Sequence, residues 1–411
     1  MSYFSLPSLP IDTDLHTILT YTASATGSDI CINKTLSFYL KHAKGQIDNK
    51  ANLWDKYKKY TNVYEYIHTS IPQSKNGVCK IKPLSRSFYK MIEICRTLRL
   101  IDSLPEDKCK TYHFAEGPGG FIEAIAYLRD NKDDNYLGMT LLNNKDISIP
   151  GWSKSQEFLE KNTNVTIETG ITMDGNMLAY SNLTDCHNKH SNSCNLVTGD
   201  GGVDFTADFN NQERSSLKLM FAQVAYAIAC QKTGGVFILK MFDTFTEGSV
   251  DILYILSRIY EQVYLFKPNT SRTANSEKYV ICINYRLQDN TRILHSMTEI
   301  IRAFKDNIIP TRFISSSIPY MYITALQEIN AIYGQAQLEC INQTLILIES
   351  STEEVLSAIT KLHIHKCVQW CCKNKLPYNK HLSSPFGYNN TFMPSYHSHK
   401  NPLMLQSILQ K

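Results

Sequence analysis

The feature that most constrains the fold is a glycine-rich turn between an apolar run and a helical pattern. The apolar run covers residues 111–115, the turn reads Glu-Gly-Pro-Gly-Gly-Phe at 116–121, and the helical pattern continues to residue 129. Glycines let a ligand approach the backbone, and the start of the next helix presents free amide groups. In an α/β fold this turn lies at the carboxyl end of a strand, where nucleotides bind. A bare Gly-Pro-Gly-Gly is more often a simple tight turn, but the flanking strand and helix favour a cofactor site.

Short apolar runs alternate with helical patterns from about residue 80 to residue 286, which is typical of a doubly wound α/β sheet. Seven runs have the length and composition of strands, and four segments between them have those of helices. Strands are expected at 111–115, 136–140, 165–168, 195–198, 235–239, 262–266 and 278–284, and helices at 86–100, 120–129, 213–230 and 249–260. The sequence therefore predicts a seven-stranded α/β core.

The chain divides into four parts by composition and pattern. Residues 1–75 mix polar and aromatic positions and are expected to form a helical extension, followed by the α/β core at 76–290. Residues 291–376 are expected to be helical. Residues 377–411 are rich in Asn, Ser, His and Pro, so we expect a mobile tail there. The Tyr- and Lys-rich stretch 54–68 has two interpretations, a helix that packs its tyrosines or a cationic edge that stacks on nucleic acid.

Composition narrows the class of protein without identifying it. The net charge is only +4, so a nucleic acid would have to be held by a local basic patch rather than by the overall field. The 12 cysteines are dispersed and no cleavable signal is visible, so we expect free thiols, an intracellular reducing compartment and no membrane span. The group His363, His365, Cys367, Cys371 and Cys372 matches no closed zinc pattern, so we expect no metal.

Four charged residues give the second constraint. Asp200 follows the fourth strand in LVTGDGG, Lys240 ends the fifth in GGVFILK, Lys90 lies on the first helix and Glu277 begins the last strand. Each alone would be taken for a turn residue or a surface charge. In this order, and with the glycine-rich turn, they resemble the Lys-Asp-Lys-Glu tetrad of the FtsJ-like RNA 2′-O-methyltransferases, in particular the cap-specific mRNA branch of eukaryotes and large DNA viruses.

This resemblance covers about residues 85–286 and implies the fold, the cofactor and most of the binding site. The implied fold is a Rossmann-like class I methyltransferase with a seven-stranded doubly wound sheet, and the implied cofactor is S-adenosylmethionine. The family pattern places an acid four residues before the first glycine, where this chain has His113, and here an acid directly precedes that glycine instead. The implied cofactor-binding residues are Glu116, Gly117, Pro118, Gly119, Gly120, Phe121, Met139, Thr140, Leu141 and Asp200.

The tetrad implies a mechanism with a base beside the ribose. A 2′-hydroxyl is a poor nucleophile, so it has to be aligned and deprotonated opposite the sulfonium methyl group. Lys240 is the candidate base, oriented by Asp200, while Glu277 holds Lys90 and the ribose. We expect burial, Lys90 and the sulfonium charge to lower the pKa of Lys240 from about 10.4. Because no phosphoryl charge develops, the reaction requires no metal.

The substrate implied by the cap-specific branch is capped mRNA, methylated on the first transcribed nucleotides. Glu213, in the phrase Asn-Gln-Glu after Asp200, either recognises 7-methylguanine or simply begins the following helix. Arg86, Lys267 and Arg272 are candidates for phosphate contact. Partners in the capping or transcription machinery are implied, in the cytoplasm, the nucleus or, for a viral member, the viral factory or virion. Two alternatives stay open, a methyltransferase for ribosomal or transfer RNA and a catalytically silent RNA-binding subunit.

Overall fold

The structure, a computed structural model, describes residues 3–11, 14–26, 30–142, 151–202 and 211–380. The chain forms two compact units, each made of two segments. The first unit combines Met1–Asn49 with Pro83–Asn342, and the second combines Lys50–Lys82 with Gln343–Lys411. Both candidate sites suggested by the sequence, the glycine-rich turn and the tetrad, belong to the first unit.

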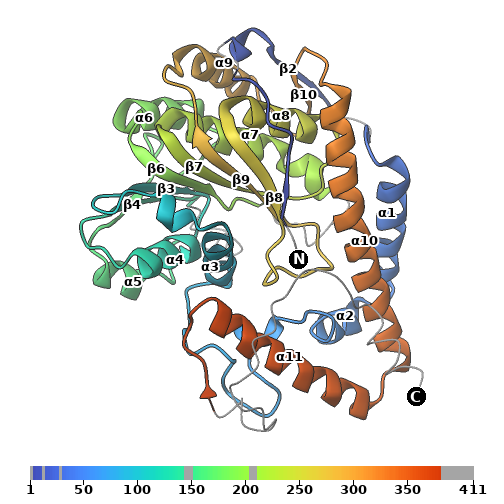
Figure 1. Ribbon diagram of the computed structural model, residues 1–411. Helices are drawn as coiled ribbons and strands as arrows, with labels where there is room; N and C mark the ends of the chain where they lie inside the picture. The colour runs from blue at the N-terminus through green and yellow to red at the C-terminus, as the bar shows by residue number, and fades with distance from the viewer. Residues whose placement is uncertain (1–2, 12–13, 27–29, 143–150, 203–210, 381–411) are drawn as a thin grey trace. The chain divides into compact units, whose positions relative to one another are not determined.

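The first unit is built on an eight-stranded sheet with the order β1-β8-β9-β7-β6-β3-β4-β5 (Figure 1). All seven predicted strands are present, and the sheet gains one more at its edge. Strands β5, β4, β3, β6 and β7 are parallel, whereas β9 runs antiparallel to β7 and β8, and β1 antiparallel to β8. The strands are β1 (Tyr3–Ser5), β3 (Lys110–Phe114), β4 (Asn135–Met139), β5 (Val165–Glu168), β6 (Cys194–Gly199), β7 (Gln231–Met241), β8 (Tyr260–Phe266) and β9 (Lys278–Tyr285).

The direction of winding reverses at β3, and this reversal places the site. From β3 the chain adds β4 and β5 on one side, then returns to add β6 and β7 on the other. In such sheets a crevice forms at the carboxyl ends of the strands beside the reversal, where ligands bind. The ends that meet there are those of β3, β4, β6 and β7, which precede Ala115, Thr140, Asp200 and Phe242.

Helices cover both faces of this sheet (Figure 1). On one face α3 (Ser87–Leu98) packs against α4 (Gly120–Arg129). On the other face, α6 (Tyr180–His190), α7 (Gln212–Cys230) and α8 (Glu247–Ile259) form a layer. The short helix α5 (Gln156–Lys161) lies between β4 and β5 in the chain. All four helices predicted for the α/β core are present as α3, α4, α7 and α8.

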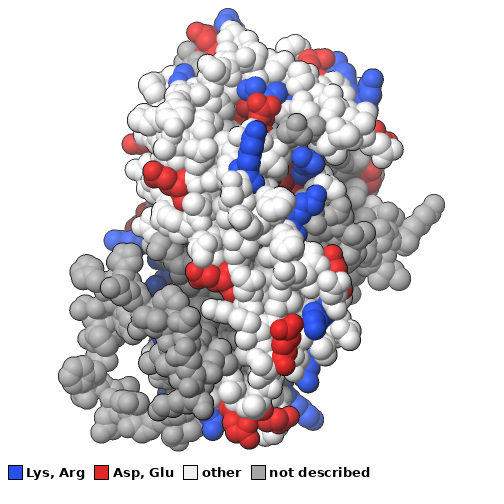
Figure 2. Space-filling model, turned by 90° about the vertical axis from the view of Figure 1, so that its right-hand side faces the viewer, with Lys and Arg blue, Asp and Glu red and all other residues white. Residues whose placement is uncertain are grey.

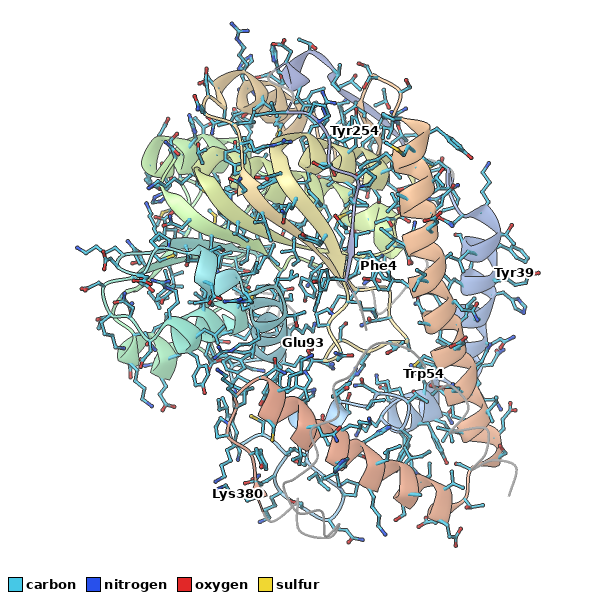
Figure 3. All side chains as sticks on the ribbon, in the orientation of Figure 1. Phe4, Tyr39, Trp54, Glu93, Tyr254 and Lys380 are labelled. Carbon is cyan, nitrogen blue, oxygen red and sulfur yellow. The ribbon has the colours of Figure 1, made fainter. Side chains whose placement is uncertain are left out.

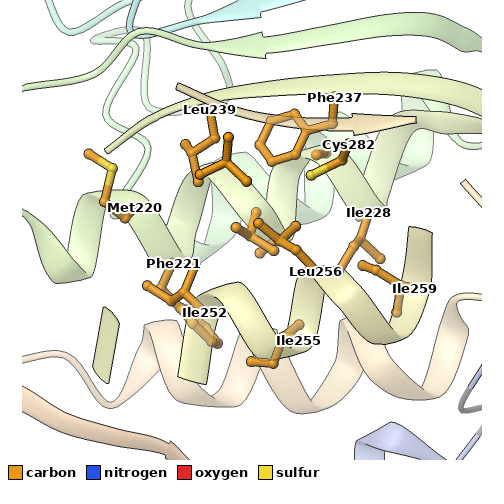
Figure 4. Packing of buried hydrophobic residues seen from close by; sticks show 14 of the residues in the cluster. Met220, Phe221, Ile228, Phe237, Leu239, Ile252, Ile255, Leu256, Ile259 and Cys282 are labelled. Atoms are coloured by element: carbon orange, nitrogen blue, oxygen red, sulfur yellow. The ribbon is translucent and has the colours of Figure 1, made fainter. Parts of the chain in front are cut away.

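The main hydrophobic core lies between the sheet and helices α7 and α8 (Figure 4). Phe221 and Leu256 of these helices share the core with Phe237 and Leu239 of β7. Because side chains alternate along a strand, Phe237 and Leu239 face this core and Lys240 faces the opposite side, where α3 and α4 lie. The alternation of β7 therefore directs Lys240 away from the core and toward α3.

Residues 1–49 and 291–342, predicted to be helical regions, contain strands as well as helices. Helices α1 (Lys34–Asp48) and α9 (Thr291–Arg302) and the first part of α10 (Tyr320–Ser350) are present. However, β2 (Leu19–Ser24) pairs antiparallel with β10 (Ile309–Ile314), and β1 extends the main sheet. Each of these strands pairs with a segment more than 250 residues away, as in the register Thr22 to Arg312. A partner at that distance leaves no local periodicity that could be recognised in the sequence.

The second unit contains α2 (Ala51–Tyr57), the last part of α10 and α11 (Glu353–Lys373). Tyr66, in the Tyr- and Lys-rich stretch, is buried, and the Cys367 thiol of α11 donates to the Val63 carbonyl at 3.5 Å. This supports the packing interpretation for that part of the stretch. Residues 377–380 of the expected mobile tail are held in place, since the Pro377 carbonyl accepts from the Lys80 amide at 2.9 Å. The rest of that tail, 381–411, lies outside the described residues.

Charged side chains of both signs are distributed over the face drawn in Figure 2, in small groups rather than one extended patch. No helix in the described part of the chain is both long and apolar enough to cross a membrane. Among the same residues, no three His, Cys, Asp or Glu side chains come together as a metal site would require, and this includes the group on α11.

Candidate active site

The four charged residues singled out in the sequence form two ion pairs. Lys90 Nζ lies 2.7 Å from Glu277 Oε1, and Lys240 Nζ lies 3.3 Å from Asp200 Oδ1 and 2.5 Å from the Asp200 carbonyl oxygen. They come from α3, the residue before β9, the carboxyl half of β7 and the residue after β6. Between 9% and 14% of each side chain is exposed, so the groups are largely desolvated but can be reached from solvent.

Tyr279 joins the two pairs, and the sequence analysis did not identify it. Its hydroxyl donates to Asp200 Oδ1 at 3.1 Å, and Lys90 Nζ lies 5.9 Å from the centre of its ring. In the β7–β9 register Tyr279 is paired with Lys240. The available signal was its spacing, because a residue two positions after Glu277 faces the same side of the strand.

The charges around Lys240 correct the expected direction of its pKa. Burial by itself lowers the pKa of Lys240, but Asp200 and Glu277 raise it more, and the net pKa lies above the ordinary value. Burial opposes ionisation of Glu277, yet Lys90 and Lys240 hold its pKa well below the usual range. The expectation of a lowered pKa counted burial, Lys90 and the sulfonium charge of a bound cofactor, and it left out the two nearby carboxylates. In the protein alone, Lys240 is therefore a stable ammonium ion and Glu277 a stable carboxylate.

The glycine-rich turn directly follows β3 and leads into α4, as predicted. Gly119 has φ of +103°, which side chains other than glycine rarely adopt. A Cβ atom on Gly117 would lie 2.5 Å from the Gly151 carbonyl oxygen, so the turn is closely covered there. Phe121 donates its amide to Glu116 Oε1, fixing the acid against the start of α4. The turn therefore needs glycine at both positions, one for its backbone angle and one for close packing.

Glu116 carries the feature that fits a cofactor. It is 3% exposed, and its Oε2 atom is buried without a hydrogen-bond partner among the described residues. Burial and the neighbouring Asp200 raise the pKa of Glu116 well above its ordinary value. An unpaired buried carboxylate oxygen is costly unless a donor or a cation reaches it. The α-ammonium group of S-adenosylmethionine would supply both, so the residues present fit the cofactor that the resemblance implies.

His113, which stands where the family pattern has an acid, has a structural role. It is fully buried in β3 between Thr198 on β6 and Thr111 on its own strand, at 2.8 and 2.7 Å. Burial lowers its pKa to about 3. A neutral imidazole bonded on both sides within the sheet is not available to a cofactor, and Glu116 is the acid that we expect in that role.

The next strand, β4, ends beside the turn with the other predicted cofactor residues. The Met139 carbonyl accepts from the Ala115 amide at 2.7 Å, which joins the ends of β3 and β4. Thr140 is buried, and a Cβ on Gly175 would lie 1.9 Å from its carbonyl oxygen. Leu141 is 40% exposed at the strand end. These three residues lie at the expected edge, and their contact with a cofactor stays a prediction.

The structure gives Glu213 a role different from cap recognition. The side chain is buried, and its Oε1 atom accepts from the amides of Phe245 and Thr246 at 2.9 and 2.8 Å and from the Thr246 hydroxyl at 2.7 Å. It thereby fastens the start of α7 to the loop before α8. A carboxylate engaged in this way is not presented to a guanine base. The alternative that Glu213 simply begins α7 is also incomplete, because the side chain bonds to residues 245 and 246 as well.

Lys267 is likewise not arranged for phosphate contact. Its ammonium group donates to the Asn275 carbonyl and side chain at 2.7 and 3.0 Å and to the Glu277 carbonyl at 2.7 Å. Burial lowers its pKa to about 7. An adjoining cavity of about 10 Å³, which Lys267 and Lys278 help to line, has room for about one water molecule. Lys267 therefore shapes the loop that carries Glu277.

One of the two arginine candidates contacts this loop and the other belongs to it. Arg86, before α3, donates from Nη2 to the Thr270 carbonyl at 3.0 Å. Arg272 lies within the loop and is partly exposed. Phosphate contact by either arginine stays a prediction.

Comparison with known proteins gives one family and relatives with named activities. Residues 83–285 match the model of the FtsJ-like methyltransferase family. A Danio rerio protein named cap-specific mRNA (nucleoside-2′-O-)-methyltransferase 2 is 27% identical over 334 residues, which cover 78% of this chain and 44% of that protein. A Mus musculus protein named cap-specific mRNA (nucleoside-2′-O-)-methyltransferase 1 is 36% identical over 186 residues, covering 44% of this chain and 22% of that protein.

The chain thus spans less than half the length of these relatives. Among solved structures, human methyltransferase-like protein 13 in complex with SAH is 12% identical, with a TM-score of 0.34, and the match covers 54% of this chain and 94% of that one. The family match coincides with the α/β core and includes the glycine-rich turn and both ion pairs. Over residues 83–285 this chain is similar to the FtsJ-like methyltransferase family.

Proposed function

We propose that the protein is an S-adenosylmethionine-dependent, cap-specific mRNA 2′-O-methyltransferase that acts on the first transcribed nucleotides. The observation that supports it most is the pair of ion pairs, Lys90 with Glu277 and Lys240 with Asp200, beside Glu116 at the carboxyl edge of the sheet. The cap specificity in this proposal is taken from the names of the relatives. Capped mRNA as partner, contact with the capping machinery and action inside the cell or in a viral factory belong to the same proposal.

The cofactor would supply an electrophilic methyl group on a positively charged sulfur. Glu116 would hold its amino-acid end, while the turn at 117–120 lets it approach the backbone. The ribose hydroxyl would lie at Lys240 Nζ, the candidate base, which Asp200 keeps in place. The Lys90–Glu277 pair would bind the ribose and help to fix the direction of attack.

The raised pKa of Lys240 has a consequence for this mechanism. A base has to be neutral before it accepts a proton, and Asp200 and Glu277 favour the charged form. A positive charge on a ligand bound close by would act in the opposite direction and lower this pKa. Proton acceptance by Lys240 therefore depends on how far the bound substrates compensate the two carboxylates.

The proposal is tested by methyl transfer from radiolabelled cofactor to one RNA sequence with three 5′ ends. These ends are a 7-methylguanosine cap, an unmethylated guanosine cap and a triphosphate. Transfer to the ribose of the first nucleotides, fastest on the 7-methylguanosine cap, is expected. Equal rates on all three ends would favour a methyltransferase for other RNA, and RNA binding without transfer to any of them would favour the catalytically silent subunit.

A further inference from the structure

Three side chains on one face of α3 reach the loop 267–277, which ends at Glu277. Arg86 precedes Lys90 by four positions and Glu93 follows it by three, so the three lie on one side of the helix. Lys90 pairs with Glu277, and Arg86 donates to the Thr270 carbonyl. The third side chain, Glu93, has no part in the mechanism described above.

Glu93, which is labelled in Figure 3, contacts this loop through both carboxylate oxygens. Oε1 accepts from the amide and the side chain of Asn269 at 2.9 and 2.6 Å, and Oε2 accepts from the amide and the hydroxyl of Thr270, both at 3.1 Å. The residue is 4% exposed. A buried carboxylate that accepts four hydrogen bonds from two adjacent residues fixes the position of their backbone closely.

The loop passes this constraint on to Glu277. Directly after Thr270, the Ser271 hydroxyl donates to Glu277 Oε1 at 2.9 Å, the same oxygen that pairs with Lys90. The Ser271 amide donates to the Pro268 carbonyl at 3.0 Å, which closes a turn around the residues that Glu93 holds. A displacement of Asn269 and Thr270 would therefore move Ser271 and with it the carboxylate of Glu277.

We propose that Glu93 is a positioning residue for methyl transfer, which sets the Lys90–Glu277 pair through the turn 268–271 and Ser271. The proposal rests on the function proposed above, because it assigns the Lys90–Glu277 pair to the ribose. Glu93 itself touches neither substrate nor cofactor. Its effect is to keep two charged groups, one on α3 and one at the end of the loop, at a fixed separation.

Glu93→Gln tests this with a minimal change in shape. An amide has one acceptor oxygen, and its NH₂ group would face an N–H donor of Asn269 or Thr270. Part of the hydrogen bonding between residue 93 and the loop is therefore lost. We expect kcat for capped RNA to fall by about 10- to 100-fold, because displacement of a reacting group by about an ångström has an effect of that size. Cofactor affinity, measured by calorimetry, should be unchanged, since Glu116 lies on another segment.

Asp251→Asn is the matched control. Asp251 is also a buried carboxylate with four accepted hydrogen bonds, from the Arg312 side chain and the amides of Phe313 and Ile314, on the sheet face opposite to the site. Both variants should lose thermal stability, but only Glu93→Gln should lose kcat per folded molecule. Equal kcat losses in the two variants, or full activity in Glu93→Gln, would overturn the proposal.

A double-mutant cycle with Ser271→Ala separates positioning from a general structural effect. If Glu93 acts through Ser271, the loss of kcat in the double variant should be little greater than the larger of the two losses in the single variants. Multiplied losses would show that the two residues act independently, and the proposal would be wrong.

Hydrogen exchange gives a readout that needs no RNA. The amides of Asn269 and Thr270 are bonded to Glu93, so Glu93→Gln should speed exchange in the segment 268–277, whereas Asp251→Asn should not. Unchanged exchange in that segment overturns the proposal. An unmutated protein that transfers no methyl group would instead count against the proposed function, with the exchange experiment still deciding whether Glu93 orders the loop.

Discussion

Lys240 is held between two carboxylates in a largely desolvated site, and this determines how its proton can leave. Asp200 contacts its ammonium group directly, and Glu277 acts on it from the other ion pair. At the scale of single residues, the site is a balanced set of two cations and two anions around Tyr279. Removing one member leaves a partner charge that is largely desolvated and uncompensated, so the effect of each substitution should be specific.

Lys240→Ala should reduce methyl transfer by about 10²- to 10⁴-fold, the range expected for loss of a general base. Cofactor affinity should remain close to that of the unmutated protein, because Lys240 acts on the hydroxyl. Radiolabel transfer and calorimetry measure the two quantities. Lys232→Ala, at the exposed start of the same strand, is the control. A Lys240→Ala variant with near-normal transfer would exclude the lysine as base.

The rate of transfer should increase with pH through the neutral range. Because the pKa of Lys240 is raised, its neutral fraction grows about tenfold per pH unit at any pH below that pKa. The logarithm of kcat should therefore rise with a slope near one from about pH 7 to pH 9 in a single-turnover assay. A plateau that begins below about pH 8 would contradict a raised pKa in the complex and show that the bound substrates reverse the shift.

At the scale of elements, function depends on how loops are attached to the helices and strands beside them. The turn at 116–121 is fixed by the Phe121 amide on Glu116, and the loop 267–277 by Glu93 and Lys267. The loop before α8 is fixed by Glu213. In each case a buried acidic or basic side chain bonds to backbone groups of the loop and fixes their position.

Gly119→Val should abolish cofactor binding in a protein that still folds. The backbone angle of Gly119 is strained for any other residue by about 1–3 kcal/mol, and a new Cβ would lie 3.3 Å from the Trp152 ring. Gly45→Val is the matched control, since a Cβ there meets nothing within 4 Å. Calorimetry with the cofactor measures the effect, and unchanged affinity in Gly119→Val would place the cofactor elsewhere.

Glu213→Ala should lower stability and leave cap preference intact. The substitution leaves the Phe245 and Thr246 donors buried without their acceptor, at a cost of about 1–3 kcal/mol each. A lower thermal midpoint is expected, together with an unchanged ratio of rates on methylated and unmethylated caps. If the ratio fell toward one while stability stayed constant, Glu213 would recognise the cap after all.

At the scale of the whole molecule, the charge is small and mixed. The net charge is +4, and Figure 2 shows both signs on the face it draws. Nucleic-acid affinity that relies on many phosphate contacts would need a strongly basic surface. If the protein acts on capped RNA as we propose, we expect recognition mainly by contacts at the RNA end, with few phosphates held.

Binding to a short capped RNA should accordingly depend weakly on salt. Each phosphate contact to a single strand contributes about −0.7 to the slope of log K against log salt, so a slope no steeper than about −3 is expected. Fluorescence anisotropy over a range of salt concentrations measures it, and the same RNA without its cap is the control. A slope near −6 would show an extended basic track instead.

The amino-acid sequence by itself determined the seven core strands, the turn at Glu116 and the tetrad, because each corresponds to a local pattern of residues. An apolar run, a cluster of glycines or a charge at a strand end can be recognised without knowing its neighbours. Tertiary structure alone decided the pairing of β1 and β2 with distant strands, the links through Tyr279 and Glu93, the anchoring role of Glu213 and the raised pKa of Lys240. The physical reason is the same in every case, since hydrogen bonds and Coulomb interactions depend on distance in space, and folding brings together residues that the sequence keeps far apart.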